Sequence, residues 1–161
     1  GPGEEPQMKV FCDLHIHSCL SPCGDALMTP NNIVGMAYIK QLDAIAVCDH
    51  NTAENLPAVK EVADMMGVTL LPGMELTTRE EAHMLAYFPD VDSALTFSRL
   101  VHEHLPPINN RPEFFGRQVI MNGQDEEVGE EERLLISALD WPFEECERQI
   151  HRFGGLCACL R

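Results

Sequence analysis

Residues 43–51 of the chain have the sequence DAIAVCDHN, a short apolar run that ends in Asp49 and His50. An unbroken apolar run of this length is typical of a strand that is buried on both faces of a parallel sheet. Ligands of parallel α/β folds gather at the carboxyl ends of the strands, where Asp49 and His50 would lie. This segment therefore predicts both a parallel strand and a group of functional side chains at its end.

The same alternation of buried strand and amphipathic helix extends over most of the chain. We expect strands at residues 10–16, 43–48, 68–71, 84–88, 118–121 and 156–160, and helices at residues 31–41, 52–66, 93–104 and 142–153. This alternation is typical of a parallel sheet with helices packed outside it. The pattern breaks down at about residues 105–133, where we expect an irregular acidic excursion over the surface.

Composition limits the class of protein. The chain has 161 residues, of which 45% are hydrophobic, and this suits one globular domain with a core. Its 26 acidic residues against 11 Lys and Arg give a formal net charge of −15, which disfavours binding to a phosphate backbone. No apolar run approaches the roughly 18 residues that would cross a bilayer. Seven irregularly spaced cysteines, with no signal peptide, favour a reducing cytoplasm over a disulfide framework.

Side chains that commonly bind metals accompany successive predicted strands. The series consists of His15 and His17 at the end of the first strand, Asp49 and His50 after the second, Glu75 after the third and His83 just before the fourth. A His-x-His pair on an extended chain projects both imidazoles from one face. A mixture of imidazole and carboxylate ligands suits zinc, manganese or iron. Each pair alone is a weak indication, but their repetition at one rim predicts a metal site.

Four motifs, in this order along the chain, resemble those of the PHP (polymerase and histidinol phosphatase) superfamily. They are Asp13-Leu14-His15-Ile16-His17-Ser18, Cys48-Asp49-His50-Asn51, Pro72-Gly73-Met74-Glu75 and Ala82-His83-Met84-Leu85. The resemblance extends from about residue 9 to residue 156. It implies a distorted (β/α)7 barrel that holds up to three divalent metal ions and hydrolyses phosphoesters.

The resemblance also implies the metal-binding residues. His15 and His17 resemble ligands of a first metal, Glu75 a carboxylate that bridges two metals, His83 a ligand of the second metal, and His50, in its motif with Asp49, a ligand of the third.

Three further positions have expected roles that the motifs leave open. Cys23 occupies the place where family members often have a further His or Asp ligand, with Asp25 close by. A thiolate there would favour zinc, but Cys23 is equally well an ordinary loop residue, with Asp25 capping the next element. Asp13 is expected to orient a ligand histidine. Arg79 is the cationic side chain nearest in sequence to the site and is expected to seat a phosphate, unless it is an ordinary surface arginine.

Later motifs of the family have no counterpart in this sequence. After Gly154 and Gly155 the chain continues only to Arg161, without the further ligand His and the Asp-x-His pair of the family. We therefore expect residues 1–8 to be a leader and residues 9–161 to be the N-terminal two-thirds of a PHP-like domain. The expected fold is α/β, an incomplete and distorted (β/α)7 barrel, whose open strand edges would favour a homo-oligomer.

Grouped metal ions neutralise a phosphoester, acidify water and stabilise the leaving oxygen, so that no nucleophilic side chain is needed. The sequence thus predicts a cytoplasmic hydrolase, a PHP-type phosphoesterase or phosphatase, that uses one to three zinc, manganese or iron ions on a small phosphate monoester. We expect a small phosphorylated substrate as partner, with no nucleic acid and no membrane. Two alternatives are a catalytically incomplete metal-binding or interaction module and a metal-dependent nuclease or proofreading domain.

Overall fold

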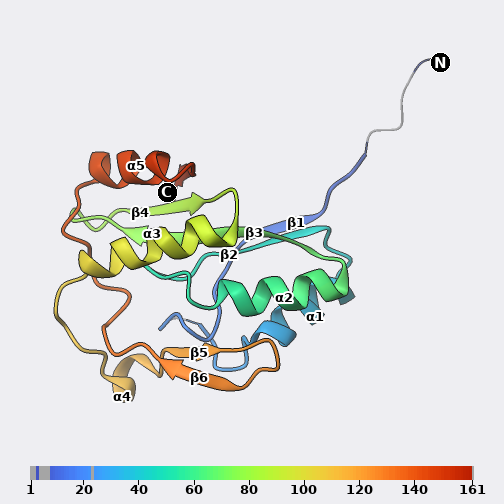
Figure 1. Ribbon diagram of the computed structural model, residues 1–161, viewed down its shortest axis with the longest axis horizontal. Helices are drawn as coiled ribbons and strands as arrows, with labels where there is room; N and C mark the ends of the chain where they lie inside the picture. The colour runs from blue at the N-terminus through green and yellow to red at the C-terminus, as the bar shows by residue number, and fades with distance from the viewer. Residues whose placement is uncertain (1–2, 4–7, 23, 161) are drawn as a thin grey trace.

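The computed structural model describes residues 3, 8–22 and 24–160, which form a curled sheet with helices packed against it (Figure 1). Its elements are, in chain order, β1 (Cys12–Ile16), α1 (Pro30–Ile39), β2 (Ala44–Val47), α2 (Leu56–Met66), β3 (Thr69–Thr77), β4 (His83–Tyr87), α3 (Val91–Glu103), α4 (Pro112–Phe115), β5 (Val119–Met121), β6 (Glu127–Glu130), α5 (Phe143–Arg152) and β7 (Leu156–Cys159). Among these residues, five strands form a sheet in the order β1-β2-β3-β4-β7, and β5 pairs with β6. This is the α/β, partial-barrel fold that the sequence predicts.

The first three strands of the sheet are parallel, as predicted, and α1 and α2 connect them. Ile45 of β2 pairs with Leu70 of β3 in this register. The hydroxyl of Thr29 caps α1 by accepting a hydrogen bond from the Asn32 amide. α2 ends at Gly67, whose φ of 72° is a left-handed conformation that glycine adopts readily. Local sequence signals therefore set the ends of both crossover helices.

The remaining strands depart from the all-parallel prediction. β4 is antiparallel to β3, with Thr77 opposite His83, and β7 is antiparallel to β4. The chain reverses in a tight turn that is closed by hydrogen bonds between Thr78 and Ala82. This turn is far shorter than the connection of about a dozen residues that parallel strands require. β3 is also longer than predicted, so that Glu75 lies within a strand rather than after one.

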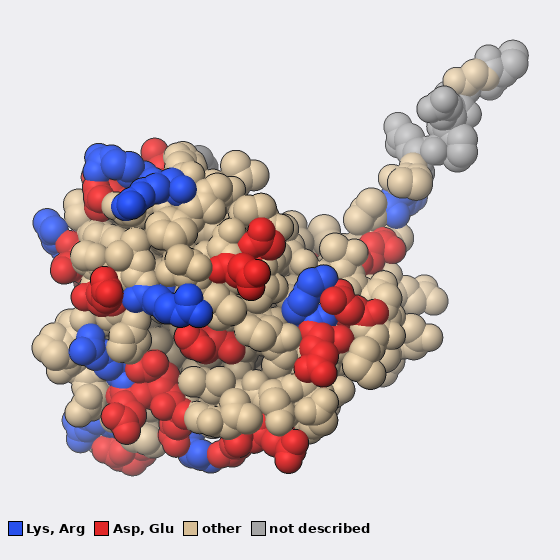
Figure 2. Space-filling view, in the orientation of Figure 1, with Lys and Arg blue, Asp and Glu red and all other residues tan. Residues whose placement is uncertain are grey.

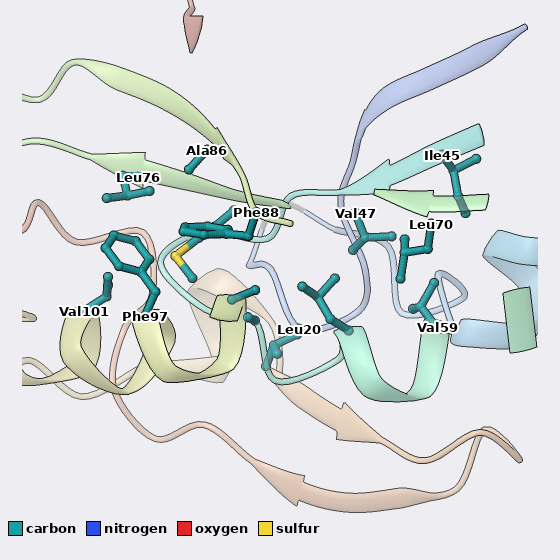
Figure 3. Packing of buried hydrophobic residues seen from close by; sticks show 14 of the residues in the cluster. Leu20, Ile45, Val47, Val59, Leu70, Leu76, Ala86, Phe88, Phe97 and Val101 are labelled. Atoms are coloured by element: carbon teal, nitrogen blue, oxygen red, sulfur yellow. The ribbon is translucent and has the colours of Figure 1, made fainter. Parts of the chain in front are cut away.

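The core lies between the sheet and its helices, as Figure 3 shows. Val47 and Leu70 of the sheet face Val59 of α2 in one part of the core. In another part, the rings of Phe88 and Phe97 pack with their centroids 5.0 Å apart. Full burial of side chains of this size contributes roughly 1.5–3 kcal/mol each. This packing holds the strands whose ends carry the predicted metal ligands.

The segment at residues 105–133, predicted to be irregular, contains α4 and the β5–β6 hairpin. Val119 pairs with Glu130 across the hairpin. Gln118 anchors the segment from within, because its buried side-chain amide donates to the carbonyl oxygens of Glu131 and Arg133. The strand predicted at residues 118–121 corresponds to β5, whereas β6, with four residues, is too short for an alternating pattern to show.

Gly73 lies where β3 passes close to β2, and it provides a test of this packing. A Cβ at Gly73 would clash with Cys48 Sγ and lie 3.1 Å from the Val47 carbonyl oxygen. We predict that Gly73→Ala lowers the free energy of unfolding by about 1–3 kcal/mol, because a buried strand has to move. Gly35→Ala on α1, where an added Cβ has no neighbour within 4 Å, is the control.

Gly35→Ala is expected to stabilise the protein by about 0.5–1 kcal/mol, because alanine favours the helix more than glycine does. Urea unfolding monitored by circular dichroism measures both variants. A Gly73→Ala protein as stable as the wild type would show that β2 and β3 are not packed as described.

Candidate metal centre

Glu75 projects from β3 into a group of four histidines. Its Oε1 atom is 2.6 Å from His15 Nε2 and 3.4 Å from His17 Nε2. Its Oε2 atom is 3.1 Å from His83 Nδ1 and 3.4 Å from His50 Nδ1. The two oxygens of one carboxylate therefore face two different pairs of imidazoles.

The sheet brings these five side chains together from four segments of the chain. β1 carries His15 and leads into His17, at the carboxyl end of the parallel strands. Just beyond β2 the backbone forms a parallel bridge to β3 at His50 and Glu75. The tight β3–β4 turn then brings His83, the first residue of β4, back beside Glu75. The antiparallel β4, which the sequence pattern did not indicate, is what places the fourth imidazole.

Electrostatics favour an ionised Glu75 carboxylate and a neutral His50 imidazole. Burial by itself raises the pKa of Glu75, but the hydrogen bond with His17 and the charge of His50 outweigh it and lower the pKa to about 2. Burial lowers the pKa of His50 to about 4, against the opposing effect of Glu75. For His17 burial also acts to lower the pKa, but the hydrogen bond with Glu75 and the charge of Asp49 raise it overall. His50 is therefore neutral at pH 7, and neutral imidazole is the form that binds metals.

Two sets of ligand atoms are close enough together to hold one metal ion each. The first set is His15, His17 and Glu75, and the second is His50, Glu75 and His83. Within each set the ligand atoms lie within 4.8 Å of one another. Imidazole nitrogens with a carboxylate oxygen are a donor set that suits zinc, manganese or iron. The residues of each set thus fit a divalent ion, and Glu75 belongs to both sets.

Asp49, predicted as a metal ligand, lies behind the histidines and outside both sets. Its Oδ1 accepts hydrogen bonds from the Ser18 amide and the Ser21 hydroxyl, both at 2.7 Å. Its Oδ2 accepts from the Ser18 hydroxyl at 2.6 Å. Burial raises the pKa of Asp49, while these hydrogen bonds and the charge of His17 oppose the rise. Both carboxylate oxygens of Asp49 therefore accept hydrogen bonds from serines.

Asp13 and Arg79 also lie outside the two sets of ligand atoms. Asp13 Oδ1 accepts a hydrogen bond from the backbone amide of His15 at 3.3 Å, so its contact is with the main chain. Asp13 and His15 line a pocket of about 250 Å³. The Arg79 guanidinium donates from Nε to the Asp140 carbonyl oxygen at 3.1 Å. Asp13 therefore lies next to the candidate ligand His15, and the Arg79 guanidinium binds a backbone carbonyl of the protein itself.

Cys23 lies outside the residues that the structure describes, so its predicted metal role stays a prediction. Asp25 accepts a hydrogen bond from the Leu27 amide at 2.8 Å in a local turn, whereas the residue that caps the next helix, α1, is Thr29.

Sequence reasoning missed Ser21 and Asn55 as residues of the site. Both belong to a buried network around Asp49. Asn55 reaches Ser18 across 37 residues of sequence, and hydrogen bonds over such separations leave no periodic signal in a single sequence. Only the folded arrangement shows the network.

The chain is similar to two bacterial ribonucleases over part of its length. It is 36% identical over 76 residues to the 5'-3' exoribonuclease Rnm of Salmonella typhimurium, a match that covers 46% of this chain and 25% of that relative. It is 33% identical over 69 residues to the 5'-3' exoribonuclease of Haemophilus influenzae, covering 43% of this chain and 24% of the relative. The similarity thus spans about a quarter of the length of each relative.

Similarity of fold extends over nearly the whole chain. The lesion-specific endonuclease PfuEndoQ from Pyrococcus furiosus superposes with a TM-score of 0.62 and 20% identity, covering 93% of this chain and 34% of that one. A complex of Endonuclease Q with a 27-mer duplex substrate gives a TM-score of 0.56 and 21% identity, covering 92% and 34%. At such low identity these structures support the partial-barrel fold alone.

The relatives overturn the predicted partners. The family resemblance led to the expectation of a small phosphorylated substrate, and the net charge of −15 to that of no nucleic acid, but this prediction of partners is wrong, because relatives of this chain are exoribonucleases. Net charge averages over the whole surface, whereas a substrate meets the local field of the site, where metal cations, when bound, would be the largest charges. Among the described residues, no helix combines the length and apolar character needed to cross a membrane.

The family model of the PHP domain matches residues 13–140. This range contains the four motifs at the strand ends and both sets of candidate ligand atoms. The match covers well over half of the chain, in agreement with the fold and with the histidine-rich cluster. The chain therefore belongs to the PHP domain family.

Proposed function

We propose that this chain carries the metal-binding part of a hydrolase that cleaves phosphodiester bonds in nucleic acid. The observation that carries the proposal is the position of Glu75, whose two oxygens face two separate pairs of histidines. A carboxylate in this position suits a pair of divalent ions, an arrangement found in phosphatases and nucleases. The exoribonuclease relatives favour nucleic acid as the substrate class over a small monoester.

In this proposal His15, His17 and Glu75 would hold one ion, and His50, His83 and Glu75 would hold the other. When bound, such ions polarise phosphoryl oxygens and lower the pKa of water. The protein keeps His50 in the neutral form that binds metals, because burial lowers the pKa of its imidazole. The lowered pKa of Glu75 keeps that carboxylate ionised at every pH at which the protein would work.

The exposure of the ligands suits a polymeric substrate. The side chains of His83 and His15 are 49% and 36% exposed, whereas Glu75 is 5% exposed at the base of the cluster. On the face that Figure 2 shows, acidic and basic side chains are interspersed, and acidic ones gather over the β5–β6 hairpin. An acidic surface repels a phosphate backbone. The proposal therefore assigns phosphate binding to the metal ions rather than to a surface patch of Lys and Arg side chains.

The first prediction of this proposal concerns metal affinity. Glu75→Gln keeps the size of the side chain but removes the charge that both ions would share. We expect its affinity for Zn²⁺ and Mn²⁺ to fall by more than about 100-fold, beyond the usual loss for residues that merely support a ligand. Isothermal titration calorimetry on the full 161-residue chain measures the change.

The control for metal affinity is His151→Ala. This substitution removes an exposed imidazole on α5 that lies outside both sets of ligand atoms. Its affinity for both ions should equal that of the wild type. A Glu75→Gln protein that binds as tightly as this control would rule out a shared carboxylate.

A second prediction concerns the substrate. With Mn²⁺ or Zn²⁺ added, the chain should cleave single-stranded RNA or DNA oligonucleotides faster than it hydrolyses p-nitrophenyl phosphate, a small monoester. Chelation by EDTA should abolish cleavage, and His83→Ala should lower the rate by about 100-fold or more. His151→Ala again serves as the control and should retain full activity. Metal-dependent hydrolysis of the monoester alone would contradict a nucleic-acid substrate.

A further inference from the structure

We infer that Asp49 and Ser21 fix the tautomer of His17, and that Asn55 ties this pair to the β5–β6 hairpin. The inference rests on the proposed metal site, because its consequence is the direction of one metal-binding nitrogen. The three residues act as positioning residues: each one acts on the metal site through the hydrogen bonds that it makes with its neighbours.

The argument begins with the single hydroxyl hydrogen of Ser21. Its Oγ lies 2.7 Å from Asp49 Oδ1 and 3.3 Å from His17 Nδ1, and it accepts a hydrogen bond from the His50 amide at 3.1 Å. Ser18 also donates an amide and a hydroxyl hydrogen to the same carboxylate. Three donors converge on Asp49, as an acceptor-only carboxylate requires. The Ser21 hydrogen therefore points to Asp49, and its oxygen accepts from His17 Nδ1.

This assignment decides which nitrogen of His17 is free to bind a metal. A neutral imidazole carries one hydrogen on one of its two nitrogens. With that hydrogen on Nδ1, the lone pair is on Nε2, the atom 3.4 Å from Glu75 Oε1. The other tautomer would direct an N–H at the metal position. Hydrogen bonds behind a ligand histidine commonly select its tautomer in this way.

The same hydroxyl supports the second set of ligands. The His50 amide donates to Ser21 Oγ, which fixes the backbone from which the His50 ring projects. The rings of His17 and His50 stack with centroids 4.7 Å apart and planes 10° from parallel. Ser21 thus contacts one member of each candidate metal set, and its loss affects both.

Asn55 extends the network to the hairpin. It is fully buried, and its Nδ2 donates to Ser18 Oγ at 3.0 Å and to the Val119 carbonyl at 3.1 Å. Its Oδ1 accepts from the Met121 amide at 2.9 Å. Val119 and Met121 belong to β5, so the side-chain amide pairs with this strand much as a neighbouring strand would. A continuous chain of hydrogen bonds therefore runs from β5 through Ser18 to Asp49.

The direct test is the tautomer of His17 in the Zn²⁺-bound, full-length chain, because without a metal the Glu75 carboxylate beside Nε2 favours a hydrogen on that nitrogen. Long-range ¹H–¹⁵N correlation spectra of the histidine rings report it, at a pH well above the ordinary imidazole pKa so that the ring is neutral. A His17→Gln variant assigns the signals. We expect the Nδ1–H form in the wild type and a mixture of both forms in Ser21→Ala. The Nε2–H form in the wild type, or no change in Ser21→Ala, would overturn the inference.

Metal affinity supplies a second readout. Ser21→Ala is expected to weaken Zn²⁺ binding by about 10–100-fold, and Asn55→Ala to weaken it in the same direction. Ser21→Thr, which keeps the hydroxyl, should restore the affinity. Ser98→Ala is the matched control, because the buried Ser98 hydroxyl accepts a hydrogen bond from the Ala53 amide outside this network. Equal affinities of the Ser21→Ala and Ser98→Ala proteins would contradict the inference.

The two proposals fail in different ways. A wild-type chain that binds neither Zn²⁺ nor Mn²⁺ would refute the metal site together with the inference that rests on it. A wild-type chain that binds metal, with Ser21→Ala binding equally well, would refute the network alone.

Discussion

A buried negative charge in the middle of the sheet is the constraint on which the rest of the site depends. The side chain of Glu75 is 5% exposed, and a buried ion costs several kcal/mol unless partners compensate it. The compensation comes from four imidazoles at 2.6 to 3.4 Å, two on each oxygen. Cations bound beside this buried carboxylate, with the imidazole nitrogens as their other ligands, would stabilise its charge further. The metal-site proposal follows from this requirement.

The topology of the sheet brings the imidazoles to the buried Glu75 carboxylate from a few short segments of the chain. Parallel β1, β2 and β3 end at one rim, and the tight return into β4 adds a ligand from the other direction. The core beneath, packed between the sheet and its helices, holds these strands in register. The β5–β6 hairpin then contacts the back of the site through Asn55. A surface segment is in this way part of the support of the candidate metal centre.

Membership of the PHP domain family and the arrangement of the cluster are separate lines of argument, and they agree. Family membership comes from a match over residues 13–140. A fold alone does not define a function, which has to be argued from the site. The proposal of paired divalent ions rests on the two sets of ligand atoms that share Glu75, and the proposal of a nucleic-acid substrate rests on the exoribonuclease relatives. The charge of the whole chain pointed away from nucleic acid, because it describes the average surface and not the local field at the candidate site.

The sequence by itself determined the α/β class, the parallel strands β1 to β3 and the residues of the cluster. Apolar runs and helix caps depend on neighbours a few residues away, so a single sequence records them. Only the tertiary structure decided that β4 runs antiparallel, that Asp49 lies behind the histidines, and that Asn55 joins the hairpin to Ser18. These features depend on hydrogen bonds between residues that are distant along the chain. No local periodicity encodes such bonds, which form only when the packed sheet brings their donors and acceptors together.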